Sequence, residues 1–155
     1  MKGKLKEYLA YGMHVATLIL YFILLFVVEI PPGLVFLQYF AFLFFGIGIV
    51  FVVLSIITQT RKKEARIIQS GVYALVRHPM YFGAMCLFLA MALFLPHWIM
   101  ILLSMLNLVV IFRFMITEER ENLEKLGPEY KVYMEEVPRL NLLLGLMRAL
   151  KQKKD

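Results

Sequence analysis

A short polar segment lies between two long apolar stretches of the chain. Residues 70–83 read SGVYALVRHPMYFG and include Tyr73, Arg77, His78 and Tyr81. Pro79 suits the first position of a helix, which puts His78 near the N-cap and disfavours α geometry there. The start of a helix can hold a carboxylate or a phosphate. The segment is therefore either a binding site or an interfacial belt in which Arg77 reaches lipid headgroups.

A second polar feature is the carboxylate pair Glu118-Glu119, which follows an apolar run. Such a pair can bind the cation of a ligand, or it can simply solvate a helix that has left a membrane. Arg113 lies inside the run IFRFMI, where a charge is costly unless it reaches the interface, pairs or lines a site.

Metal and nucleotide sites of familiar kinds are not expected. Cys86 is the single cysteine, and no HExxH, P-loop or GxGxxG motif is present. No second histidine shares the helix face of His14, so we expect a hydrogen-bonded core histidine there and no metal site.

The composition is that of an integral membrane protein. Hydrophobic residues make up 61% of the 155 residues, against roughly 45–50% in soluble domains, and the mean hydropathy is +0.75. The net charge of +6 comes from basic residues that flank apolar stretches. This pattern favours a membrane-surface role and argues against a nucleic-acid partner.

The elements that would position these residues are four membrane helices. A span needs about 20 mostly apolar residues, and four stretches qualify or nearly do: Tyr8–Val28, Leu34–Ile57, Met80–Leu95 and Trp98–Ile116. Short turns at 29–33 and at Pro96-His97 join them as two hairpins. We therefore predict an all-α, polytopic membrane protein, with residues 1–155 forming a single membrane domain.

The basic residues predict the orientation of these spans. All 17 Lys and Arg residues precede the first span, lie between the second and third, or follow from Arg113 onward. Neither short turn contains one. By the positive-inside rule, both termini and the middle loop are cytoplasmic.

The tail from residue 117 to 155 is charged but keeps apolar residues at helical spacings. Gly127 suits a helix end and Pro128 the first turn of the next helix. We predict two short helices broken at this pair, which cap the cytoplasmic end of the bundle, then an amphipathic piece at Asn141–Leu150 and a frayed end. Glu121 and Lys125 form a favourable i,i+4 pair.

The ordered motifs resemble those of a known superfamily. GVYALVRHPMYFG at 71–83, Glu118-Glu119, GPEY at 127–130, Tyr133 and VPR at 137–139 are similar to the set found in isoprenylcysteine carboxyl methyltransferases and phospholipid methyltransferases. The resemblance covers roughly residues 59–140. It implies a membrane-embedded enzyme that depends on S-adenosylmethionine.

The resemblance also implies roles for individual residues. The cofactor would be lined by Gln59, Ile67, Ile68, Tyr73, His78, Pro79, Tyr81 and Glu118. Glu119 and Arg113 would be the catalytic candidates. The isoprenylcysteine enzymes have an arginine about one turn before the acidic pair; Phe114 occupies that position here, and Arg113 is adjacent.

The expected reaction is methyl transfer to a lipophilic or lipidated acceptor, with the membrane lipids as further partners. A prenylcysteine-like carboxylate would need an arginine clamp, whereas a lipid amine would need Glu118, Glu119, His78 or a water as base. The two substrates would arrive from different phases, the cofactor from the cytoplasm and the acceptor between membrane helices.

Two other functions fit the same composition. A membrane transferase that uses glutathione would need an asparagine-rich, basic helix face, but Asn107 is the only asparagine in the four spans. A non-catalytic lipid- or partner-binding protein could also use this scaffold. The sequence does not specify the acceptor or the oligomeric state.

Overall fold

The computed structural model describes residues 2–62 and 66–152, and in these ranges it is helical with no strand. The helices are, in chain order, α1 (Lys2–Val27), η1 (Pro32–Leu34), α2 (Leu37–Arg61), η2 (Gly71–Ala74), α3 (Pro79–Phe94), α4 (Trp98–Leu126), α5 (Pro128–Glu136) and α6 (Leu142–Gln152). The predicted all-α class is confirmed for the described part of the chain.

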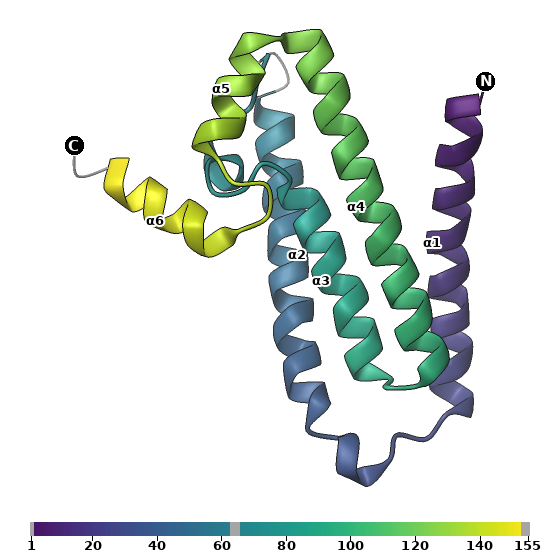
Figure 1. Cartoon of the computed structure of the whole chain (residues 1–155). Helices are drawn as coiled ribbons and strands as arrows, with labels where there is room; N and C mark the ends of the chain where they lie inside the picture. The colour runs from purple at the N-terminus through teal and green to yellow at the C-terminus, as the bar shows by residue number, and fades with distance from the viewer. Residues whose placement is uncertain (1, 63–65, 153–155) are drawn as a thin grey trace.

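Helices α1 to α4 form an up-and-down bundle, with α5 and α6 at one end of it (Figure 1). Helix α2 lies against α3, α3 lies against α4, and α1 lies beside α4. The η2 segment lies beside α2 at the α5 end of the bundle. This arrangement brings the segment 71–78, the end of α4 and α5 together, although they are far apart in the sequence.

The approach of α2 to α3 depends on two glycines. A Cβ added to Gly83 would lie 2.8 Å from the Gly48 carbonyl oxygen, and one added to Gly48 would lie 2.8 Å from Leu87. Aromatic pairs flank this contact, with ring centroids 4.7 Å apart for Phe51 and Phe82. Small residues let membrane helices approach closely, so Gly48 and Gly83 determine how near α2 lies to α3.

Two of the helices are long and apolar enough to cross a membrane, α2 and α4. Helix α3 and the apolar part of α1, Tyr11–Val27, are shorter. The 16 residues of α3 span about 24 Å at 1.5 Å per residue, somewhat less than a hydrocarbon core of about 30 Å. Length and composition therefore support two of the four predicted spans, those formed by α2 and α4.

The helix boundaries agree with the prediction at Pro79, Gly127 and Pro128. Pro79 begins α3, and the N-cap His78 has φ −121° and ψ 61°, outside α geometry. Gly127 ends α4 with φ +62°, a conformation that favours glycine, and Pro128 begins α5. The expected ion pair between Glu121 and Lys125 is also present.

The predicted division of the tail and the predicted limits of the second span are wrong. The first of the two short tail helices is not a separate element, because α4 continues without a break from Trp98 to Leu126. Residues 117–126 contain no proline or glycine, so nothing interrupts the helix where it becomes charged.

The second span starts at Leu37, since Pro32–Leu34 forms a 3-10 turn, and it extends to Arg61. Helix α6 begins one residue after Asn141 and continues to Gln152; residues 153–155 of the expected frayed end lie outside the described residues.

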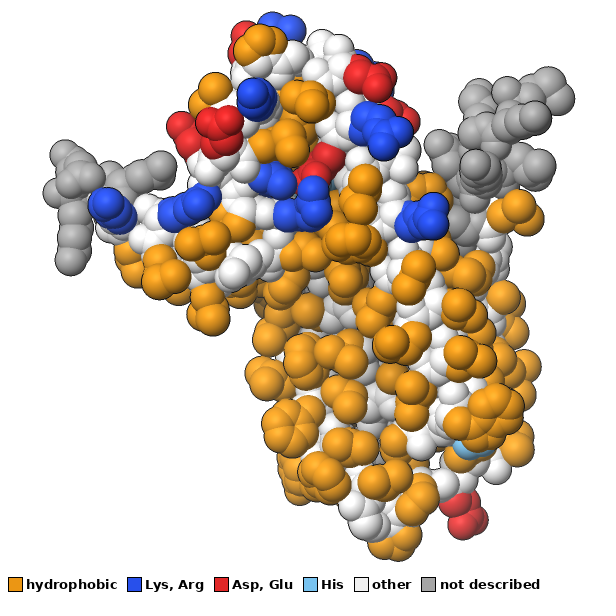
Figure 2. Space-filling model, in the orientation of Figure 1, with side chains coloured by type: hydrophobic (Ala, Val, Ile, Leu, Met, Phe, Trp, Pro, Cys, Tyr) orange, Lys and Arg blue, Asp and Glu red, His pale blue; other side chains and the backbone are white. Residues whose placement is uncertain are grey.

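The surface of the bundle is largely apolar, and charged side chains gather at the end where α5 lies (Figure 2). Many large hydrophobic side chains of α1, α2 and α4 are exposed, for example Phe26, Tyr39 and Met105. Such a surface suits a lipid environment, because water would not stabilise so large an exposed apolar area.

A polar network joins α1 to α4 inside the bundle. His14 Nδ1 is hydrogen-bonded to Asn107 Oδ1, and Asn107 Nδ2 donates to Thr17 Oγ1 at 2.9 Å. Thr17 and Asn107 are buried. The prediction that His14 is a hydrogen-bonded histidine is therefore confirmed.

Candidate active site

Glu119 is the centre of a buried charge cluster, which also contains Arg77, His78 and Arg139. Its oxygen Oε1 accepts hydrogen bonds from Arg77 Nε at 3.1 Å and Nη2 at 2.9 Å, and lies 3.1 Å from His78 Nε2. Arg139 donates to Oε2 from Nη2 at 2.6 Å and from Nε at 3.0 Å. Glu119 is only 4% exposed. The interpretation of Glu119 as a solvated surface charge is wrong.

Arg77 holds three parts of the chain together. Besides its bonds to Glu119 on α4, its Nη1 donates to the backbone carbonyls of Met134 and Val137, at and just after the end of α5. The last carbonyls of a helix have no partner within the helix, so Arg77 satisfies two acceptors there. Arg77 is 8% exposed, which rules out the interfacial arrangement in which its charge lies among lipid headgroups.

The ionised form of Glu119 is strongly favoured. Burial by itself would raise the pKa of this carboxyl, but hydrogen bonds from His78, Arg139 and Arg77 and the Arg77 charge outweigh it and hold the pKa well below its usual value. Glu119 is therefore a carboxylate at neutral pH. In the same cluster, hydrogen bonding to Glu119 raises the pKa of Arg139.

A small cavity, here called the rim cavity, lies next to this cluster. It has a volume of about 200 Å³ and is lined by Gln59, Arg66, Ile67, Ile68, Tyr73, Arg77, His78, Glu118, Asn122, Leu126, Tyr130 and Tyr133. Side chains from the end of α2, the segment 66–78, α4 and α5 thus surround one space. Glu118, unlike Glu119, is exposed, and its carboxylate contributes to the lining of the rim cavity.

The tyrosines of the rim cavity are tied to its framework. Tyr133 Oη donates to the Tyr73 carbonyl at 2.8 Å, and Gln59 Nε2 donates to the Tyr73 hydroxyl. Burial raises the pKa of both Tyr73 and Tyr133, so their phenols stay protonated and can donate hydrogen bonds. The Tyr130 and Tyr133 rings lie 5.8 Å apart and form the α5 wall.

Most of the predicted cofactor residues surround this one cavity. Six of the eight line it: Gln59, Ile67, Ile68, Tyr73, His78 and Glu118. Pro79 does not; it is buried as the first residue of α3. Tyr81 is also outside the lining, but its ring lies 5.6 Å from the His78 ring and its phenol lies near the Glu118 carboxylate.

Comparison with known proteins gives one match. A family model described as phospholipid methyltransferase matches residues 36–127, more than half of the 155 residues. The chain belongs to the phospholipid methyltransferase family. This membership agrees with the resemblance drawn from the motifs, and together with α2 and α4 it supports a membrane location and a methyltransferase-related function. Searches of curated proteins and of solved structures each gave no match.

The phospholipid methyltransferase match runs from just before α2 to the end of α4. It therefore includes Arg77, His78 and both glutamates, but not α5, α6 or Arg139. Tyr130 and Tyr133, which form the α5 wall, and Arg139, the second arginine of the Glu119 cluster, lie in the part of the chain that follows the match.

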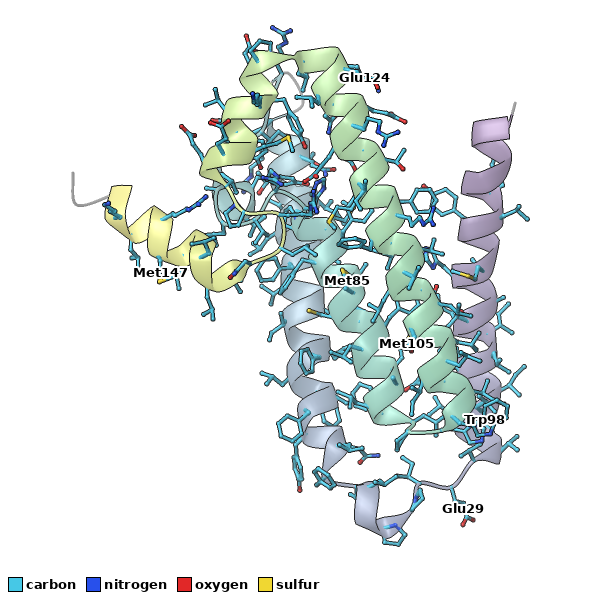
Figure 3. All side chains as sticks on the ribbon, viewed as in Figure 1. Glu29, Met85, Trp98, Met105, Glu124 and Met147 are labelled. Carbon is cyan, nitrogen blue, oxygen red and sulfur yellow. The ribbon has the colours of Figure 1, made fainter. Side chains whose placement is uncertain are left out.

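Arg113 is not brought to the rim cavity. It is exposed on α4 and lines an apolar groove, here called the lateral groove, together with Met85, Met105, Leu108, Val109, Phe112, Ile116, Thr117 and Arg120. Figure 3 labels Met85 on α3 and Met105 on α4, two of its walls. Its volume is about 630 Å³. The predicted catalytic roles of Arg113 and Glu119 remain predictions, and the two side chains lie in different surroundings.

Glu118 and Glu119 were named from the sequence, but the burial of Glu119 and the role of Arg66, Asn122, Leu126, Tyr130 and Tyr133 in lining the rim cavity were not predicted. The sequence contains a signal for some of these features. Glu119 continues a buried stripe of α4 that contains Asn107, Ile111 and Met115, and spacings of three and four residues keep one helix face toward the core. Glu118, Asn122 and Leu126 follow each other at intervals of four and share the face toward the rim cavity. Arg66, Tyr130 and Tyr133 come from other segments, and no local spacing relates them to α4.

Proposed function

We propose that this protein is an integral membrane methyltransferase that moves a methyl group from S-adenosylmethionine to a lipophilic acceptor. The observation that carries this proposal is the rim cavity, because six residues with a predicted cofactor role come from separate segments and surround it. Membership of the phospholipid methyltransferase family supports the same reaction class.

The chemistry of the rim cavity fits the cofactor. S-adenosylmethionine has a sulfonium, an ammonium and a carboxylate, and it supplies an electrophilic methyl group when bound. Glu118 suits its cationic groups, and Arg66 suits its carboxylate. Tyr73, Tyr130 and Tyr133 offer ring faces to the adenine or the sulfonium.

The size of the rim cavity limits how the cofactor would be held. Its volume of about 200 Å³ is below the roughly 300–1,000 Å³ of pockets that enclose drug-sized ligands. We therefore expect the cavity to widen on binding. The exposed side chain of Glu118 can turn outward, whereas Gln59 is hydrogen-bonded to Tyr73 and His78 is held against Glu119.

The lateral groove is the proposed site of the acceptor. Its lining is apolar except for Arg113, Thr117 and Arg120, which lie on the part of α4 nearer the charged end of the bundle. An aliphatic chain would lie against the apolar residues, and an anionic headgroup would lie near the two arginines. Arg113 is our candidate for orienting an acceptor carboxylate or phosphate.

A base is needed only for some acceptors. A carboxylate acceptor is already ionised and requires no base, whereas an amine must lose a proton. Both oxygens of Glu119 are occupied by arginine side chains, so Glu118 or a water is the more available proton acceptor. We propose that Glu119 acts through Arg77 and His78 and keeps them in position.

We also propose that all four bundle helices cross the membrane and that both termini are cytoplasmic. The distribution of the 17 basic residues supports this orientation. The turn between α1 and α2 contains the acidic residue Glu29, which Figure 3 labels at the end opposite α5. The α5 end, with the rim cavity, would then face the cytoplasm and its soluble cofactor.

The test is transfer of a tritiated methyl group from S-adenosylmethionine in liposomes made with a total lipid extract. We expect radioactivity in the organic phase with the wild type, and a large loss with Glu118→Gln but not with the exposed Glu124→Gln on the same helix. Cofactor binding without transfer to any lipid would favour the non-catalytic alternative. Absence of cofactor binding would overturn the proposal.

A further inference from the structure

Helix α6, Leu142–Gln152, is strongly amphipathic, and its apolar face is exposed. Leu143, Leu146, Met147 and Leu150 follow the spacing i, i+3, i+4 and i+7, which places them on one face of a helix. Leu143 is 75% exposed and Met147 is 62% exposed. We call these four residues the α6 stripe. In the described part of the chain, nothing buries them.

The opposite face of α6 is fixed to the body of the protein. A Cβ added to Gly145 would lie 1.8 Å from the Leu75 carbonyl oxygen, so the helix backbone lies directly against the η2 segment. Arg148 Nη1 donates to the carbonyls of Glu135 and Glu136 at the end of α5, at 2.9 and 2.8 Å. Asn141 Oδ1 accepts from Leu144 N at 3.0 Å and caps the helix start.

These contacts determine the direction of the α6 stripe. At about 100° per residue, Gly145 lies on the side of the helix opposite the stripe, so the stripe faces away from the body. Helix α6 projects sideways from the bundle (Figure 1), and Figure 3 labels Met147 on it. In Figure 2 its apolar side chains point toward the same side as the apolar surface of the bundle, and its basic side chains lie above them.

The charge of α6 also points to one partner. The helix contains the basic residues Arg148 and Lys151 and no acidic residue. Both basic side chains are exposed. A helix with an apolar face and basic residues beside it binds at the surface of an anionic membrane, with its apolar face about 5–10 Å into the boundary of headgroups and acyl chains.

We propose that α6 lies in the plane of the membrane surface, with the α6 stripe among the lipids and Lys151, at the side of the stripe, at the level of the headgroups. Arg148 keeps its hydrogen bonds to the end of α5. The apolar surface of the bundle continues toward the stripe, so one bilayer can cover both. Because Gly145 is against Leu75, two residues before Arg77, this contact also places the η2 segment and the rim cavity at the membrane surface.

The proposal is tested with single cysteines labelled with the environment-sensitive fluorophore NBD. Leu143→Cys and Met147→Cys are made in a Cys86→Ala background, and the full-length protein is placed in liposomes containing anionic lipid. Val53→Cys, exposed on α2, is the membrane reference, and Glu135→Cys, exposed on α5, is the water reference. Quenching is measured with doxyl-labelled lipids and, separately, with iodide in the buffer.

We expect the labels at 143 and 147 to be quenched by the doxyl lipids as the label at 53 is, and to be at least several-fold less accessible to iodide than the label at 135. Accessibility to iodide equal to that of position 135 would overturn the proposal. Protection from both quenchers would also overturn it, because a protein surface would then cover the stripe. Both substituted side chains are exposed, so either position alone is sufficient if one variant is poorly folded.

Discussion

Arg77 donates two hydrogen bonds to a single carboxylate oxygen of Glu119, from Nε at 3.1 Å and from Nη2 at 2.9 Å. The two residues are 42 positions apart in the sequence, and both are at least nine-tenths buried. This pair joins the segment before α3 to α4, and the remaining nitrogen of Arg77 joins both to the end of α5. The wall of the rim cavity therefore depends on one buried ion pair.

We expect Glu119→Gln to destabilise the protein strongly. The substitution leaves the buried Arg77 charge without its partner, and breaking such a pair costs about 3–5 kcal/mol. The measurement is the thermal unfolding midpoint in detergent micelles, followed by circular dichroism. Glu121→Gln is the control, because its ion pair with Lys125 is exposed and such pairs contribute about 0–1 kcal/mol. Equal midpoints for the two variants would show that the cluster does not stabilise the fold.

Stability should fall in acid because of the same carboxyl. The folded-state pKa of Glu119 is lowered, whereas the unfolded value is about 4.3. Above that pH the carboxyl is ionised in both states, and its stabilising contribution is complete. As the pH falls below about 4, the unfolded chain takes up a proton that the folded chain does not, so the contribution is progressively lost.

The measurement for this prediction is the unfolding midpoint between pH 3 and pH 7. We expect a steeper decline below about pH 4 for the wild type than for Glu119→Gln, which has no carboxyl to protonate at this position. Parallel pH profiles for the two proteins would contradict the prediction.

We expect Glu118→Gln to weaken cofactor binding, whereas Glu119→Gln lowers the stability of the fold. Glu118 is exposed and lines the rim cavity, so Glu118→Gln should leave the unfolding midpoint nearly unchanged and weaken cofactor binding. A hydrogen bond to a charged group contributes about 1.5–3 kcal/mol, which corresponds to roughly 10- to 150-fold in Kd. Isothermal titration calorimetry with S-adenosylmethionine measures this change. Glu124→Gln is the control, and an unchanged Kd for Glu118→Gln would remove Glu118 from the site.

Gly83→Ala should weaken the packing of α2 against α3. The new Cβ would lie 2.8 Å from the Gly48 carbonyl oxygen and 2.8 Å from Val52, and overpacking typically costs about 1–3 kcal/mol. Gly46→Ala is the matched control, because a Cβ there has no atom within 4 Å and alanine favours the helix by about 1 kcal/mol. We expect opposite shifts of the unfolding midpoint in micelles. A Gly83→Ala variant as stable as Gly46→Ala would show that α2 and α3 can separate without cost.

Local sequence signals predicted the helices well, since prolines and glycines act within a few residues. Pro79 marks the start of α3 because its ring fixes φ and excludes α geometry at His78. Gly127 marks the end of α4 because it adopts a positive φ. The prediction of a separate helix before Gly127 was wrong, because charged residues alone do not end a helix. Without a proline or glycine in residues 117–126, α4 continues to Leu126.

Six of the residues that line the rim cavity were named from the sequence, but the different surroundings of Glu118 and Glu119 were not predicted. Glu118 and Glu119 are adjacent and chemically identical, and a turn of about 100° between them puts one toward the rim cavity and the other into the core. Arg77 had two interpretations, lipid or ligand, and the structure shows a third arrangement, an ion pair with Glu119. Its partners on α4 and α5 are remote in sequence, so no local spacing predicts them.

By itself, the sequence determined the helical class, the breaks at Pro79 and Gly127 and the motif set shared with phospholipid methyltransferases. These features depend on backbone constraints and on hydropathy over short distances. Only the tertiary structure decided which carboxylate is buried, which arginines neutralise it and which tyrosines close the rim cavity. The physical reason is that a charge can be buried only where partners from other helices compensate the loss of water, and those partners meet only in the folded chain.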